Sequence, residues 1–285
     1  MTGRKGSRRY LTGGVVLALG LSLASGAHAQ QAVDVELVLA VDVSLSMSPD
    51  ELDIQRTGYA AALTDQRVVD AITDGMHGRI AITYFEWAGA TVQHVIVPWT
   101  IIGSREEAEA VARQLTAKPP NSARRTSISG ALSFAADLFA ESGMRGMRRI
   151  IDISGDGPNN QGGPIEPVRD MIVSQGITVN GLPLMTNGGL ASAYDVDDLD
   201  LYYASCVIGG PGAFTVPVNE WSQFAEAVRR KLVLELAGAP PALTPEEAEN
   251  PPVVKAQASG LSQDGDYDCL VGEKMWNNRT WQTWP

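Results

Sequence analysis

Oxygen-bearing side chains alternate along the segment Asp42-Val43-Ser44-Leu45-Ser46, which directly follows an apolar run. Asp42, Ser44 and Ser46 thus leave the end of a predicted strand, where the chain can turn all three towards one point. Hydroxyl and carboxylate oxygens are hard ligands, suited to Mg²⁺, Mn²⁺ or Ca²⁺ and poorly suited to zinc, which prefers His and Cys. The segment predicts a divalent-cation site, with Mg²⁺ as the first expectation, although a motif this short is weak on its own.

Two later segments add oxygen donors at the same loop end. Thr126 opens a predicted helix, and Asp156 follows a predicted strand within Ser154-Gly155-Asp156-Gly157. A metal-free alternative remains, because Ser44 could cap a helix and Asp156 could close a turn. We favour one cation held by Asp42, Ser44, Ser46, Thr126 and Asp156.

Short apolar runs alternate with amphipathic stretches over residues 33–237, which is typical of a sheet covered by helices on both faces. The predicted fold is α/β, doubly wound, with a mostly parallel central sheet. Predicted strands cover 35–41, 80–85, 92–97, 149–153, 177–182 and 214–218. Predicted helices cover 50–64, 105–116 and 164–175, and two further helices carry the apolar stripes Ile128, Ala131, Leu132, Ala135, Phe139 and Trp221, Phe224, Ala225, Val228, Leu232.

With these motifs, residues 33–237 resemble the von Willebrand factor A (VWA) family. The metal-ion-dependent adhesion site (MIDAS) of that family combines Asp-x-Ser-x-Ser with a later Thr and a later Asp followed by Gly. The resemblance implies that Ser44 and Ser46 bind the cation directly and that Thr126 binds it directly or through water. It also implies that Asp42 and Asp156 act largely through water.

Mostly neutral ligands leave such a cation with much of its charge and an open coordination position. A carboxylate from a partner protein is the ligand this favours, as is common in the family. Arg124 and Arg125 stand just before Thr126, where family members commonly have small residues. These arginines either help to receive an acidic ligand or are solvated loop charges, and we favour the second interpretation.

Residues 1–29 are predicted to be a removed signal peptide. They contain four basic residues and no acid, then an apolar run too short to span a membrane, and then Ala27-His28-Ala29, a small-x-small cleavage pattern. The mature protein is therefore expected to be periplasmic or secreted by Gram-negative-type export and not integral to the membrane. Ser7-Arg8-Arg9-Tyr10-Leu11 partly matches a twin-arginine signal, so the Sec and twin-arginine routes both stay open.

The formal net charge is -11, and it becomes about -15 without the basic leader, which disfavours nucleic acid as a partner. Cys206 and Cys269 are expected to form a disulfide after export. Residues 238–252 read as a Pro-rich linker. Residues 253–285 form a tail that contains three tryptophans, and the disulfide would tie this tail back to the main domain.

Most enzyme templates are missing from the chain, because the mature part has only His77 and His94 and no nucleophile elbow, zincin helix or phosphate-binding loop. The first hypothesis is therefore a cation-dependent protein-binding module for adhesion or complex assembly. A metal-dependent hydrolase that uses Asp42 or Asp156 as a base is the second. The third is a metal-free structural domain that binds partners through its Trp-rich tail. Glu86 and Asp152 are interpreted as structural carboxylates outside the site.

Overall fold

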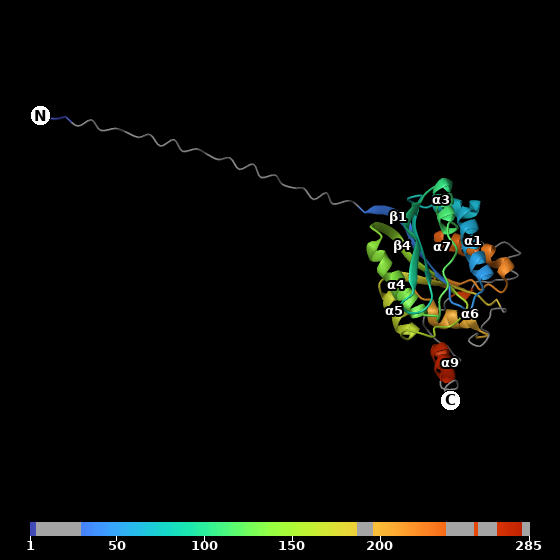
Figure 1. Ribbon diagram of the computed structural model, residues 1–285. Helices are drawn as coiled ribbons and strands as arrows, with labels where there is room; N and C mark the ends of the chain where they lie inside the picture. Colours follow the sequence, from blue (N-terminus) through green and yellow to red (C-terminus); the bar gives the residue numbers. More distant parts are fainter. Residues whose placement is uncertain (4–29, 187–195, 238–253, 256–266, 281–285) are drawn as a thin grey trace.

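The computed structural model describes residues 1–3, 30–186, 196–237, 254–255 and 267–280 (Figure 1). Almost all of the predicted signal peptide lies outside these residues, as do the predicted linker and two of the tail tryptophans, Trp281 and Trp284.

The described residues form one sheet of seven strands, in the order β3-β2-β1-β4-β5-β6-β7. Central pairs are parallel, whereas β3 and β7 run antiparallel to their neighbours. This confirms the predicted doubly wound, mostly parallel sheet. The strands are β1 (Gln31–Asp42), β2 (Ile80–Trp87), β3 (Gln93–Ile102), β4 (Met144–Gly155), β5 (Ile177–Pro183), β6 (Phe214–Thr215) and β7 (Val254–Lys255).

Helices cover both faces of the sheet because the central strands are apolar on both sides. In β1, Leu37 and Leu39 belong to one core cluster, whereas Val38 and Ala40 belong to the other. The first cluster packs against α1 (Pro49–Thr64), α2 (Gln66–Thr73), α3 (Arg105–Leu115) and α7 (Phe224–Leu236). The second packs against α4 (Ile128–Glu141), α5 (Ile165–Ser174) and α6 (Leu199–Tyr202). Helix α6 continues into a single turn of π-helix at Tyr203–Val207, called the π-turn below.

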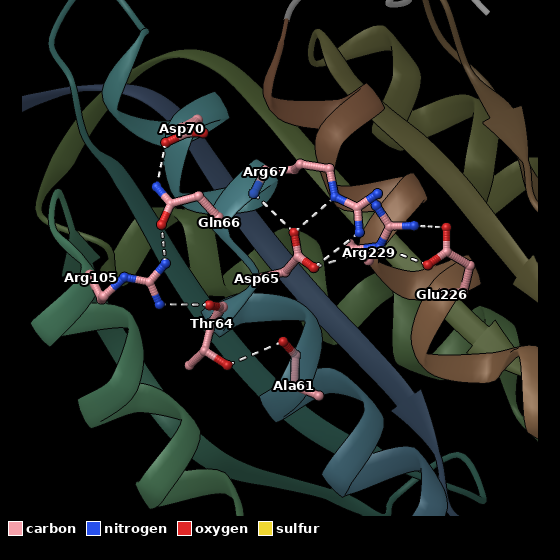
Figure 2. A network of polar contacts seen from close by, with 9 residues as sticks. All are labelled: Ala61, Thr64, Asp65, Gln66, Arg67, Asp70, Arg105, Glu226 and Arg229. Carbon is pink, nitrogen blue, oxygen red and sulfur yellow. Dashed lines mark hydrogen bonds and ion pairs between the residues drawn. The ribbon is translucent and has the colours of Figure 1, made fainter. Parts of the chain in front are cut away.

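A polar network fastens the helices of the first face to one another at the far end of α1 (Figure 2). Asp65 caps α2 by accepting a hydrogen bond from the backbone N–H of Arg67 (2.9 Å) and lies 3.8 Å from Arg229 of α7. Arg105 of α3 donates to the carbonyl of Thr64 (3.0 Å). Since α1 is 16 residues long, or about 24 Å, this network stabilises the scaffold away from the loop at Ser44 and Ser46.

The structure corrects several predicted boundaries and adds elements. The strands predicted at 35–41 and 149–153 begin earlier, at Gln31 and Met144. The predicted strand 214–218 is regular only at Phe214–Thr215, because Pro217 has no N–H for a ladder, and Val218 makes an isolated bridge to Leu184. The predicted strand 92–97 extends to Ile102 and pairs antiparallel with β2. Among the described residues, the α-helices α2, α6 and α9 (Val271–Thr280) were not predicted.

Candidate functional site

The candidate residues lie where the strand order reverses. Strands β1 and β4 are neighbours at the centre of the sheet, but the chain continues from β1 to β2 on one side and from β4 to β5 on the other. Val41 pairs with Ser154, so Asp42 and Asp156 leave adjacent parallel strands at the same edge. Ligands in open α/β sheets bind at such a switch point, outside the carboxyl ends of the strands.

Three of the predicted side chains converge on one another across the switch point. The Ser44 and Ser46 Oγ atoms are 2.9 Å apart, and the Ser46 hydroxyl donates to Asp156 Oδ1 at 2.8 Å. Ser44 Oγ lies 3.5 Å from the same carboxylate oxygen. Residues 110 or more positions apart in the sequence thus place three oxygens in one cluster.

Asp42 lies beneath this cluster and is fully buried. Its Oδ1 accepts a hydrogen bond from the backbone N–H of Ser44 (2.7 Å), whereas its Oδ2 is buried without a hydrogen-bond partner. Burial, followed by repulsion from Asp156, raises the pKa of Asp42 well above its ordinary value. A positive charge at the site would oppose both effects.

The arrangement fits a small divalent cation. Adjacent ligands of an octahedral Mg²⁺ at 2.0–2.1 Å are about 3 Å apart, and the spacings among the Ser44, Ser46 and Asp156 oxygens are 2.8, 2.9 and 3.5 Å. The buried, unpartnered oxygen of Asp42 adds an acceptor that lacks a donor. The candidate metal ligands are therefore all hard oxygen atoms, and two of the residues are carboxylates.

Thr126, the fifth candidate, lies on a loop that runs beside the first motif. Ala123 pairs with this motif by accepting from the N–H of Leu45 (2.9 Å) and donating to the carbonyl of Val43 (3.0 Å). Thr126 is buried, and within the described part of the chain its hydroxyl makes no hydrogen bond to the other four candidates. The structure thus places Thr126 on an adjoining loop but outside the hydrogen-bonded cluster.

Three supporting residues were not singled out from the sequence. Asn160 accepts from the N–H of Thr126 (3.0 Å), and Asn159 accepts from the N–H of Ser129 (3.1 Å). The Tyr203 hydroxyl is buried without a hydrogen-bond partner, and a Cβ added to Gly155 would come within 2.8 Å of it and 2.9 Å of Asp42 Oδ2. The only sequence signal was the turn-like composition around Asn159 and Asn160, which does not tell what they bond.

The two arginines before Thr126 differ in their surroundings. Arg124 is exposed, as the solvated interpretation requires. Arg125 is half-buried, and its guanidinium carbon lies 3.2 Å from the ring centroid of Trp276 in the tail. The solvated interpretation is therefore wrong for Arg125, because an aromatic face covers the cation. Leu45, between the two candidate serines, is 48% exposed.

Glu86 and Asp152 have structural partners. Glu86 is fully buried, accepts from Arg56 Nε at 2.6 Å, and also accepts from the backbone and side chain of Asn121. Asp152 lies 2.9 Å from the buried ammonium of Lys231. Neither carboxylate hydrogen-bonds to the candidate oxygens within the described ranges.

The predicted disulfide is present, with 5.5 Å between the Cα atoms of Cys206 and Cys269. It joins the π-turn after α6 to a residue two positions before α9. Tyr267 also donates to Asp198 at 2.8 Å. In the described part of the tail, the segment therefore packs against the main domain. Among the described helices, none combines the length and the apolar character that a membrane-spanning segment needs.

Solved structures with similar folds include proximal thread matrix protein 1 from the mussel byssus, in a form with a zinc-occupied MIDAS motif. Its TM-score is 0.51 and its identity 15%, with 73% of this chain and 49% of that chain covered. The pilus adhesin SpaC from Lactobacillus rhamnosus GG has a TM-score of 0.51 and 11% identity, over 72% of this chain and 31% of that chain. A von Willebrand factor type A protein from Catenulispora acidiphila has a TM-score of 0.48 and 13% identity, over 72% and 43%. This chain spans about half the length of the mussel protein.

The sheet order, the two helical layers and the similarity to the mussel protein and the pilus adhesin define a VWA-type fold. A family model described as "Protein of unknown function (DUF1194)" matches residues 32–240, and the chain belongs to that family. No curated protein matches the sequence.

Proposed function

We propose that this protein is a divalent-cation-dependent protein-binding module of the bacterial envelope. The observation that carries the proposal is the cluster of the Ser44, Ser46 and Asp156 oxygens at the switch point, above the buried carboxylate of Asp42. These residues and Thr126 would hold one cation, with Mg²⁺ as the expected ion. The mussel protein has a similar fold and a zinc-occupied MIDAS motif, which supports a metal site in a domain of this fold.

Such a cation would supply a Lewis-acidic position for a carboxylate of the partner protein. Ser44 and Ser46 are neutral ligands, and Asp42 and Asp156 would act largely through water, so the direct ligands would leave the ion with much of its charge. The exposed side chain of Leu45 lies beside the cluster and gives an approaching protein an apolar contact. An acidic residue on the partner, next to an apolar one, fits this surface.

Export is the second part of the proposal. We assign residues 1–29 to a cleaved signal peptide and residues 33–237 to the binding domain, which agrees in extent with the family match over 32–240. The linker over 238–252 and the tail over 253–285 would follow the binding domain in the exported protein. The Cys206–Cys269 disulfide supports an oxidising compartment such as the periplasm, because disulfides rarely persist in the cytosol.

The experiment combines Mn²⁺ binding with a carboxylate probe. Bound Mn²⁺ with open positions speeds the relaxation of water protons, and a carboxylate that takes an open position reduces this effect. We expect enhanced relaxation with the mature protein and its partial loss when a glutamate-containing peptide is added. A folded Ser44→Ala/Ser46→Ala variant should show no enhancement.

The matched control is Ser133→Ala/Ser174→Ala, since among the described residues these hydroxyls bond only to carbonyls of their own helices. This control should behave like the unaltered protein. An unaltered protein without enhancement would refute the cation site. Enhancement that the peptide leaves unchanged would refute the carboxylate-binding role while keeping the cation.

A further inference from the structure

The tail helix α9 contacts the loops that surround the candidate site. Figure 1 shows this helix, in red, at the end of the molecule where α6 also lies. We propose that α9 is a positioning element of the site, which holds the Thr126 loop in place through Asn159 and Arg125. The inference rests on the proposed function and extends it to a part of the chain outside residues 33–237.

The first contact joins α9 to the loop after β4. Asn159 donates from Nδ2 to Glu273 Oε1 at 2.6 Å. Gly272 lies so close to this loop that an added Cβ would come within 2.2 Å of the Asn159 carbonyl oxygen. Backbone approach at this distance requires glycine. The helix therefore docks on Asn159 by close contact as well as by a hydrogen bond to a charged group.

The same loop holds Thr126. The N–H of Thr126 donates to Asn160 Oδ1 at 3.0 Å, and the N–H of Asn160 donates to the Thr126 carbonyl at 2.9 Å. Asn159 accepts from the N–H of Ser129 at 3.1 Å. Asn159 and Asn160 thus lie between α9 on one side and the start of α4 on the other.

The second contact acts on the residue before Thr126. Arg125 has a φ of 78°, and among the described residues it is the only non-glycine residue with a positive φ. That conformation is costly for a residue with a Cβ and persists only when its surroundings hold it. Trp276 covers the Arg125 guanidinium at 3.2 Å and is one such restraint.

The disulfide holds the start of α9 near the Asn159 and Arg125 contacts. Cys269 is two residues before the first residue of α9, and its bond to Cys206 anchors the helix start on the π-turn. Loosening α9 should free Arg125 and Asn159, whereas Ser44 and Ser46 keep their own hydrogen bonds to Asp42 and Asp156. We expect the affinity for the cation to fall about tenfold, which is typical when an outer support of a metal site is lost.

Two variants loosen α9 by different means. Gly272→Ala forces the helix away from the Asn159 carbonyl, and Trp276→Ala removes the cover of Arg125. Gly163→Ala is the matched control for the first, because Gly163 is exposed and an added Cβ there meets nothing within 4 Å. Trp276→Phe retains an aromatic face and is the conservative control for the second.

Amide hydrogen exchange of the metal-free protein is measured first, and Mn²⁺ affinity second. We expect faster exchange in the peptide over 124–130 in Gly272→Ala and Trp276→Ala, with unchanged exchange in Gly163→Ala and near-normal exchange in Trp276→Phe. Mn²⁺ should bind about tenfold more weakly to the two loosening variants.

Faster exchange confined to residues 267–280 would overturn the proposal, since α9 would then move without the Thr126 loop. Faster exchange at 124–130 with unchanged Mn²⁺ affinity would overturn it as well. If the unaltered protein binds no Mn²⁺, the proposed function fails, and exchange at 124–130 alone decides whether α9 positions the loop.

Discussion

The buried Arg56–Glu86 pair links α1 to β2 and to the loop that leads to the candidate site. Arg56 Nε lies 2.6 Å from Glu86 Oε1, and both side chains are at most 4% exposed. Arg56 also donates to the carbonyls of Leu115 and Lys118, and Glu86 accepts two bonds from Asn121. Replacing one member of the pair leaves the opposite charge buried without its main partner.

The expected magnitudes follow from this geometry. Arg56→Met should lower the free energy of unfolding by about 3–5 kcal/mol, and Glu86→Leu by a similar amount. The double variant removes both buried charges and leaves only the neutral groups of Asn121, Leu115 and Lys118 unpaired, so its loss should be about 1–3 kcal/mol. The double loss is thus at least about 3 kcal/mol smaller than the sum of the single losses.

Urea unfolding of all four proteins at one pH measures this coupling. Equal m-values across the set would show that the comparison concerns stability and not the unfolded state. If the double loss equals the sum of the two single losses, Arg56 and Glu86 do not act as a pair, and the structural interpretation of Glu86 is refuted.

Three further predictions concern stability. Burial raises the pKa of the Asp152 carboxyl from 3.8 to about 7. Asp152 therefore contributes to stability at low pH, and this contribution is lost as the pH rises from about 4 to 7. The free energy of unfolding should fall over this range by up to about 1.4 kcal/mol per pH unit. For Asp152→Asn, the free energy of unfolding measured by denaturant should change less steeply with pH over this range. An unchanged pH dependence would contradict the raised pKa of Asp152. Cys206→Ser/Cys269→Ser should lower the free energy of unfolding by about 4 kcal/mol, because the disulfide closes a loop of 63 residues. A loss below about 1 kcal/mol in urea unfolding would contradict this stabilising role of the disulfide. Gly58→Ala should destabilise by about 1–3 kcal/mol despite the better helix propensity of Ala, since its Cβ would lie 2.5 Å from the Phe224 ring, and a thermal midpoint at or above that of the unaltered protein would disprove it.

The fold was largely predictable because its central strands are buried on both faces. Runs such as Leu37–Val41 are apolar without alternation, and the stripe that ends in Phe139 has the period of a helix. Chain order along the sheet, the short helix α2 and the antiparallel β7 depend on contacts between distant segments. The hydrophobic periodicity of a short segment does not predict such contacts.

The relative positions of the candidate side chains were predictable where they follow from strand ends. Asp42, Ser44, Ser46 and Asp156 converge as expected, since strand ends at one sheet edge fix their positions. The surroundings of Arg125 could not be predicted, because Trp276 lies 151 positions later, and nothing in the spacing indicates that the two side chains stack. The support of Thr126 by Asn160 was hidden for the same reason.

The most direct test of the central claim is a calorimetric titration of Mg²⁺ into the mature protein, beside Ser44→Ala/Ser46→Ala and the control Ser133→Ala/Ser174→Ala. Saturable binding of one ion is expected in the unaltered and control proteins and should be lost in the first variant, with all three equally folded by circular dichroism. Equal binding by all three proteins, or no binding of Mg²⁺ or Mn²⁺ by the unaltered one, would contradict the assignment of the cation to this site.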